Sequence, residues 1–143
     1  MDGCGQLSLP SASKLWFTPD GHWKEPGGYH NYPVSKLIEA ALMLENNGYQ
    51  IFNQYPILLN ASYVMLKYSF PDLTASAFGD TGRPRQSMEC LESAILMADK
   101  YQLPILPDLL NAAMILEQAG QYDRSKSGLT GLLCYLPELP KAK

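Results

Sequence analysis

Apolar residues recur along most of this chain at intervals of three and four, which is the spacing of one face of an α-helix. Proline, glycine and asparagine punctuate the pattern, so that it predicts helices over Val34–Asn47, Pro56–Tyr68, Gln86–Tyr101 and Pro107–Ala119. No stretch shows a convincing strand pattern. The sequence therefore predicts an all-α fold, with the helices paired as antiparallel hairpins.

The side chains expected to face the core occupy the apolar positions of that pattern. They are Val34, Leu37, Ile38, Ala41, Leu42, Ile57, Leu58, Ala61, Val64, Met65, Tyr68, Met88, Leu91, Ile95, Ala98, Leu109, Leu110, Ala113 and Met114. A weaker fifth helix is expected over Ser127–Leu136, where Gly128 and Gly131 lower the helix propensity.

One stretch of the chain occurs twice. Ala40–Glu45 reads AALMLE and Ala112–Glu117 reads AAMILE, and Gly48 and Gly120 follow the two stretches at the same distance. Such self-similarity suits stacked helical hairpins, either in an α/α toroid or in a solenoid.

Composition narrows the class of protein. At 143 residues with 46% hydrophobic residues, the chain has the length and apolar content of one packed domain. Its apolar runs stop short of the roughly 18 residues of a membrane span, and its N-terminus lacks a basic start and an apolar core, so we expect no membrane span and no signal peptide in this sequence. A net charge of −3 argues against nucleic-acid binding.

The cysteines and the absence of common motifs bear on cofactors. Cys4, Cys90 and Cys134 are widely spaced, which suits buried free thiols better than a disulfide framework or a zinc site. No metalloprotease, nucleotide-binding or serine-hydrolase motif occurs in the sequence. We therefore expect neither a metal nor another cofactor.

The candidate chemistry is concentrated in the segment Asp20–Tyr32. Its thirteen residues, DGHWKEPGGYHNY, include both histidines of the chain, two tyrosines, a tryptophan, a lysine and a glutamate. The glycines and the proline disfavour a helix here. Tyrosine and histidine can transfer protons, and cations in a loop can receive an anionic substrate, so we interpret this segment as a functional site.

The order of these residues, followed by an amphipathic helix, resembles the D-G-x-W-x-E-x-x-x-Y-H-x-Y stretch of the heparinase II/III-like and alginate-lyase-like polysaccharide lyases. The triplet Phe78–Asp80 also looks like the F-G-D element of that family, and the likeness extends from about Leu15 to Leu136. The resemblance implies an incomplete α/α toroid. It also implies cleavage of a uronic-acid-containing polysaccharide by β-elimination, with a tyrosine acting as base and then as acid.

The aligned motif places the catalytic tyrosine of the family at Tyr29, and His30 would orient it or contact the substrate. Because the ordinary pKa of a phenol is about 10, neighbouring cations must favour the phenolate. The other residues that would bind substrate are His22, Trp23, Lys24, Glu25, Tyr32, Asp80 and Arg83. Trp23 or Tyr32 would stack on a sugar ring, while Arg83 or Arg85 would pair with a uronate carboxylate.

Each of these roles has a structural alternative. Tyr29 can anchor a turn, and His30 can cap a helix or support a neighbour. Trp23 can belong to the core. Asp80 can form an Asx turn, and Arg83 can be an ordinary surface charge.

Enzymes of the family are longer, with further hairpins before this region and a β-sandwich after it. We therefore expect a fragment, with an irregular segment over 1–18, a toroid-like helical segment over 19–136 and a tail over 137–143. Its partners would be an acidic polysaccharide and the remainder of the parent toroid and β-sandwich, and its location would be periplasmic or extracellular. The upstream Asn/His element that neutralises the uronate has no counterpart in Met1–Thr18, so the isolated chain should have little activity.

The alternative is a helical binding module without chemistry. Leu116–Asp123, LEQAGQYD, resembles the A-G-x-Y-D junction of tetratricopeptide-like repeats. A solenoid prefers short and regular turns, whereas this chain has a long loop over Ser69–Arg85 as well as the Asp20–Tyr32 segment. This difference favours the lyase interpretation.

Overall fold

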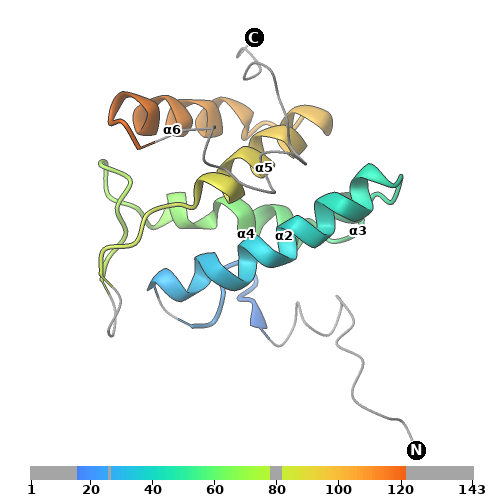
Figure 1. Ribbon diagram of the computed structural model, residues 1–143, viewed down its shortest axis with the longest axis horizontal. Coiled ribbons are helices and arrows are strands. Elements are labelled where there is room, and N and C mark those ends of the chain that lie inside the picture. The colour runs from blue at the N-terminus through green and yellow to red at the C-terminus, as the bar shows by residue number, and fades with distance from the viewer. Residues whose placement is uncertain (1–15, 26, 78–81, 122–143) are drawn as a thin grey trace, which may run out of the picture.

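The computed structural model describes residues 16–25, 27–77 and 82–121. Its elements are the 3-10 turn η1 (Gly27–His30) and the helices α2 (Asn31–Asn46), α3 (Ile51–Gln54), α4 (Pro56–Lys67), α5 (Met88–Lys100) and α6 (Leu106–Gln118) (Figure 1). Isolated β-bridges join some loop residues, and the described ranges contain no strand longer than such a bridge. The all-α prediction is confirmed for this part of the chain, and the fifth predicted helix, over Ser127–Leu136, lies outside it.

Local residue chemistry sets where the helices begin and end. Pro56 and Pro107 stand in the first turns of α4 and α6, where the missing amide hydrogen has no helical partner to lose. Ser87 caps α5, because its Oγ accepts a hydrogen bond from the N–H of Cys90 at 3.3 Å. Gly48 and Gly120 follow α2 and α6 with φ angles of 88° and 67°, a left-handed conformation that glycine adopts without strain.

One helix start and one whole helix were not predicted. Helix α2 begins at Asn31 and is preceded directly by η1, so the second half of the Asp20–Tyr32 segment is helical rather than a loop. The short helix α3 was not predicted, because four residues are too few to show a period, but it buries Ile51 and Phe52.

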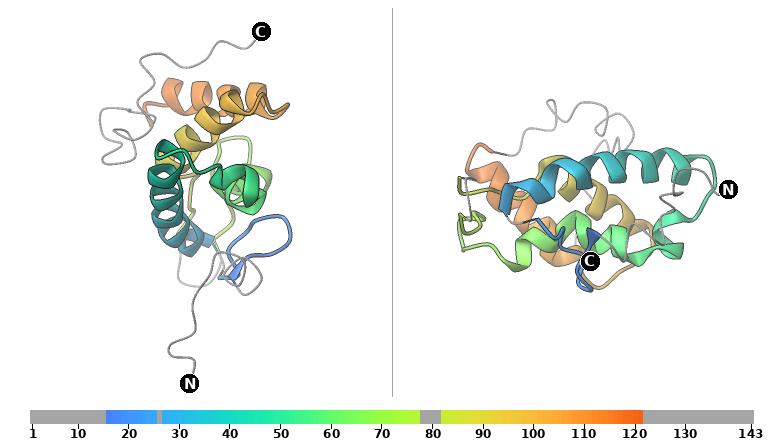
Figure 2. Two further views of the ribbon diagram at one scale, coloured as in Figure 1. Left: turned by 90° about the vertical axis from the view of Figure 1, so that its right-hand side faces the viewer. Right: turned by 90° about the horizontal axis from the view of Figure 1, so that it is seen from below.

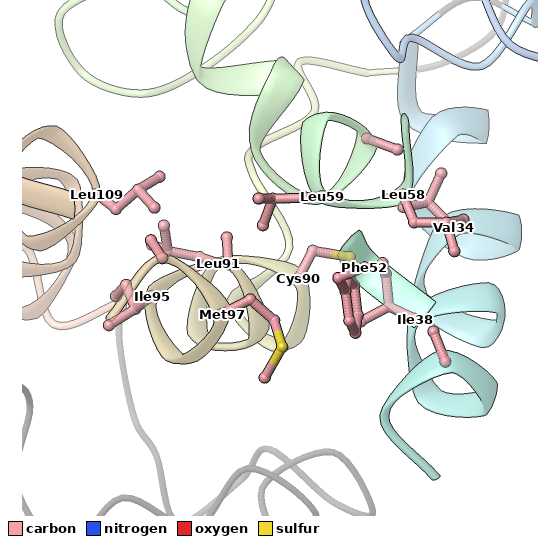
Figure 3. Packing of buried hydrophobic residues seen from close by; sticks show 14 of the residues in the cluster. Val34, Ile38, Phe52, Leu58, Leu59, Cys90, Leu91, Ile95, Met97 and Leu109 are labelled. Carbon is pink, nitrogen blue, oxygen red and sulfur yellow. The ribbon is translucent and has the colours of Figure 1, made fainter. Parts of the chain in front are cut away.

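Helix α5 is central. It contacts α2, α4 and α6, and Figure 2 shows it running between α6 on one side and α2 and α4 on the other. In Figure 3 its side chains Cys90, Leu91 and Ile95 lie between Leu109 of α6 and Phe52 of α3. Each fully buried side chain of this size contributes about 1.5–3 kcal/mol relative to exposure, so tertiary packing rather than helix propensity holds the bundle together.

Most of the positions expected to face inward are buried or partly buried, and two are not. Tyr68 and Met114 are 54% and 48% exposed. Tyr68 follows the last residue of α4 as its C-cap, where the helical face no longer continues. Met114 lies five residues after the buried Leu109, which on a helix places it away from the face that packs on α5.

A buried carboxylate joins α2, α3 and the end of α5. Glu45 accepts hydrogen bonds from Lys100 Nζ and the Tyr101 hydroxyl, each at 2.5 Å, and from the N–H of Phe52 at 3.4 Å. Burial by itself would raise the pKa of Glu45, but the hydrogen bonds from Lys100 and Tyr101 outweigh it and lower the pKa. Burial, followed by the bond to Glu45, raises the pKa of Tyr101 to about 12.

The expectation of buried thiols can be examined at one cysteine. Cys90 is a free thiol with 1% of its surface exposed, and burial raises its pKa to about 12. Cys4 and Cys134 lie outside the described residues. None of the described helices has the length and apolar character needed to cross a bilayer.

Candidate functional site

A tight turn brings the segment before α2 onto helix α4. Phe17 and Trp23 pair as an antiparallel bridge, and the N–H of Thr18 donates to the carbonyl of His22 at 2.8 Å. Gly21 closes this turn with a φ of 99°. A Cβ at this position would lie 2.8 Å from the backbone nitrogen of Ala61, so only glycine allows the turn to approach α4 this closely.

His30 fastens the same segment to α4. Its side chain is 1% exposed, its Nδ1 accepts the N–H of Trp23 at 2.9 Å, and its Nε2 donates to the carbonyl of Ala61 at 2.9 Å. Burial lowers the pKa of His30 to about 4, and the bond to Ala61 opposes that shift only in part. Because both ring nitrogens are engaged, His30 is neutral here and holds the segment against α4.

Tyr29 stands next to His30 in η1 and points outward. Its side chain is 47% exposed, and Tyr32, one helical turn further on, is 74% exposed. The hydroxyl-bearing ring of Tyr29 is therefore on the surface rather than in a closed apolar core, at a backbone position that the neighbouring histidine holds in place.

A carboxylate and a tyrosine join the turn to the end of α4. Asp20 accepts hydrogen bonds from the Thr18 hydroxyl at 2.5 Å and from the Tyr68 hydroxyl. The bond from Thr18 and then that from Tyr68 lower the pKa of Asp20 to about 2. The bond to Asp20 in turn raises the pKa of Tyr68 and keeps this phenol protonated.

His22 completes this group. Its Nδ1 donates to the carbonyl of Trp23 at 2.6 Å, and its ring lies 4.8 Å from the ring of His30. The ring of Tyr68 meets it nearly edge-on, at 5.6 Å and 87°. The structure therefore brings both histidines of the chain together with Tyr68, which the sequence placed in the core.

Trp23 is enclosed on several sides. Its ring is stacked on Trp16 at 5.4 Å with an interplanar angle of 6°, and Phe17 meets it edge-on at 5.4 Å. Its indole N–H donates to the Glu25 carboxylate at 3.0 Å. Glu25 thus orients the Trp23 ring. Trp16, with 44% of its surface exposed, is the more open of the two tryptophans.

The loop over Ser69–Arg85 contacts the site where the loop ends, at Arg85. The side-chain amide of Asn31, at the start of α2, donates to the carbonyl of Arg85 at 2.8 Å. Arg83 is exposed and lines an open hollow of about 380 Å³ together with Phe70, Pro71, Asp72 and Thr74. Asp80 lies outside the described residues.

Lys24 is exposed, and its N–H donates to the carbonyl of Trp16 at 2.9 Å. Lys24 therefore stands opposite Trp16 in the antiparallel pairing that Phe17 and Trp23 form. Within the described ranges, no group of three or more histidine, cysteine, aspartate or glutamate side chains is arranged to hold a metal ion.

Sequence reasoning missed Trp16, Asp20 and Tyr68. Asp20 begins the recognised motif but had been given no role, and Trp16 is the one other tryptophan of the chain, seven positions before Trp23. Tyr68 gave no signal, because its contact with Asp20 joins residues 48 positions apart.

Comparison of the chain with protein-family profiles, with curated proteins and with solved structures found no match.

Proposed function

We propose that this chain is part of a polysaccharide lyase that cleaves uronic-acid-containing polysaccharide by β-elimination. In this proposal α2, α4, α5 and α6 are paired as antiparallel hairpins and form a portion of an α/α toroid, in a protein of the periplasm or the cell exterior. The observation that carries the proposal is the position of Tyr29, a half-exposed tyrosine on a turn that the buried His30 fastens to α4.

Tyr29 would remove the proton from the carbon next to the uronate carboxylate. The carbon–hydrogen bond breaks, a carbon–carbon double bond forms, and the bond to the 4-linked sugar breaks with its electron pair on the leaving oxygen. The same tyrosine then returns the proton to that oxygen. His30 contributes by fixing the backbone beside Tyr29, and the exposed Lys24 and the partly exposed His22 are the other basic residues of the same segment.

The carboxylate of the substrate must also be neutralised, because charge builds on it as the proton leaves. His30 does not supply that charge, since it is neutral and both of its ring nitrogens are bonded. Arg83 is exposed on the second loop and suits a carboxylate through its planar fork of donors. The isolated chain should therefore release little unsaturated uronate, and a longer parent protein should release more.

The test is the ultraviolet absorbance of unsaturated uronate, measured in a parent protein that contains this chain. Tyr29→Phe should lower turnover by about 100-fold or more, because it removes the proton-transferring hydroxyl and keeps the ring. Tyr49→Phe is the matched control, because it removes the hydroxyl of an exposed tyrosine beyond the far end of α2, and it should leave turnover within about twofold. Unimpaired turnover in a stably folded Tyr29→Phe parent would remove Tyr29 from the mechanism.

A helical binding module remains the second candidate, and one observation favours it. The two similar stretches end in the same way: the N–H of Tyr49 donates to the carbonyl of Leu44 at 3.1 Å, and the N–H of Gln121 donates to that of Leu116 at 2.8 Å. Such repetition suits stacked repeats. A binding module would show no affinity for any acidic oligosaccharide and no dependence on Tyr29.

A further inference from the structure

The aromatic pair Trp16–Trp23 has a face that the proposed mechanism does not use. Trp23 is covered by Trp16 at 5.4 Å, in nearly parallel planes, so a ligand cannot stack on that side of Trp23. Trp16 is 44% exposed although one of its faces is covered, which leaves its outer face toward solvent. An exposed indole of this kind, beside a candidate site, is a common feature of binding surfaces.

The orientation of this outer face is fixed by the contacts behind it. The ring of Trp23 is held by edge-on contact with Phe17 and by the hydrogen bond from its indole N–H to the Glu25 carboxylate. Its backbone N–H donates to His30 Nδ1. Trp16 is held in turn by stacking on Trp23 and by a hydrogen bond from the backbone N–H of Lys24 to its carbonyl oxygen. A ligand that binds a ring already fixed in place loses less side-chain entropy than one that must order it.

We propose that the outer face of Trp16 is a stacking platform for one ring of an acidic polysaccharide, with Lys24 providing the charge for its carboxylate. This inference rests on the proposed function and adds to it a subsite residue that lies outside the D-G-x-W motif. The apolar C–H face of a pyranose matches a flat indole, and a carboxylate on the same ring matches an ammonium group close by.

The position of the platform relative to Tyr29 supports this assignment. Trp23 supports Trp16 with its ring, and with its backbone N–H it binds the side chain of His30, the residue after Tyr29. One residue, Trp23, therefore contacts both the platform and the histidine next to the candidate base.

The experiment measures binding to the chain itself, so that it does not depend on turnover. The chain has only two tryptophans, and their indole N–H signals can be followed by NMR during titration with a tetramannuronate and, for comparison, with neutral cellotetraose. Binding of tetramannuronate should move the Trp16 signal more than the Trp23 signal. Trp16→Ala should weaken binding by about tenfold or more, which corresponds to the loss of about one strong aromatic contact.

Matched variants make the result decisive. Trp16→Phe keeps a ring against Trp23 and should retain most of the affinity, and Tyr49→Ala removes another exposed aromatic side chain, at the far end of α2, and should change nothing. Lys24→Gln should weaken binding of tetramannuronate by a few-fold and leave any binding of cellotetraose unaltered.

The outcomes separate the two proposals. Tight binding by the wild type with unchanged affinity in both Trp16 variants would overturn the platform and leave the lyase proposal standing. Binding that depends on Trp16, together with full turnover in a Tyr29→Phe parent, would support the platform and overturn the mechanism. A wild-type chain that binds no acidic tetrasaccharide at millimolar concentration would overturn the platform, and turnover in the parent protein would still decide the lyase proposal.

Discussion

The ends of α4 and α5 carry the same two residues, lysine followed by tyrosine, and in both cases the tyrosine is the C-cap and donates its hydroxyl to a carboxylate. At the end of α5, Tyr101 binds Glu45, which is 5% exposed. At the end of α4, the half-exposed Tyr68 binds Asp20 beside the candidate site. The two pairs differ chiefly in how much water surrounds them.

That difference assigns the pairs different roles. Burial is the main cause of the raised pKa of Tyr101, whereas the bond to Asp20 is the main cause of the raised pKa of Tyr68. The lysines differ as well, since Lys100 pairs with Glu45 while Lys67 lies over the ring of Tyr63 at 5.3 Å. The same Lys-Tyr sequence therefore forms a buried structural contact at the end of α5 and a solvated hydrogen bond beside the candidate site at the end of α4.

The largest effect on stability is expected at the buried carboxylate, Glu45. Glu45→Ala should lower the free energy of unfolding by about 2–3 kcal/mol, because it leaves the Tyr101 hydroxyl and the Phe52 N–H without their acceptor, while Lys100 can turn to water. Asp20→Ala should cost about 1 kcal/mol or less, since its partners are already solvated. Urea unfolding measures both, and equal losses would mean that burial does not separate the two pairs.

Acid should weaken the site end of the molecule before the Glu45 end. The pKa of His30 is lowered from 6.5 to about 4, so the unfolded chain binds more protons than the folded one in that range and stability falls as pH drops from 6.5 toward 4. The loss should reach about 2 kcal/mol near pH 4.5. The stability that comes from the lowered pKa of Glu45 is lost only at lower pH, as that carboxylate protonates.

The pH experiment is urea unfolding of the wild type and of His30→Gln between pH 7 and 4.5. The variant should be less stable at pH 7, because glutamine cannot reproduce both bonds, and its stability should fall less steeply over that range. An unchanged slope would assign the acid sensitivity to another group.

The smallest effects are expected when the hydroxyl of either tyrosine is removed. Tyr101→Phe should destabilise the protein by about 1 kcal/mol, whereas Tyr68→Phe should change stability by no more than about 0.5 kcal/mol. In Tyr68→Phe the pKa of Asp20 should rise but stay below its ordinary 3.8, because the larger contribution comes from Thr18. An NMR titration of the Asp20 carboxyl checks this second expectation.

The helices were predictable because their determinants are local. Apolar spacing identified α2, α4, α5 and α6, and residues such as Pro56 and Gly120 marked their ends to within a few positions. The short helix α3 was not predictable in this way, since Ile51 and Phe52 are held by packing and not by a repeating pattern.

The candidate site was predictable in location but not in geometry. The sequence shows that Asp20–Tyr32 is unusual, yet it does not show that His30 turns inward to Ala61, 31 positions away, or that Tyr68 turns outward to Asp20. It also left two roles open for Trp23, a sugar platform or a core side chain, and did not show that Trp23 stacks on Trp16. These contacts join distant segments, so no local pattern encodes them.

Gly21 has a consequence for how this protein tolerates change. Its left-handed backbone and its contact with α4 close position 21 to every side chain, whereas Gly48 has a similar φ and nothing within 4 Å of a Cβ. In a saturation mutagenesis library scored for folded protein, position 48 should accept asparagine and other residues that adopt a left-handed conformation, while position 21 should accept glycine alone. The segment that carries the candidate site can thus diversify at its exposed side chains, but not at the point where its backbone rests on α4.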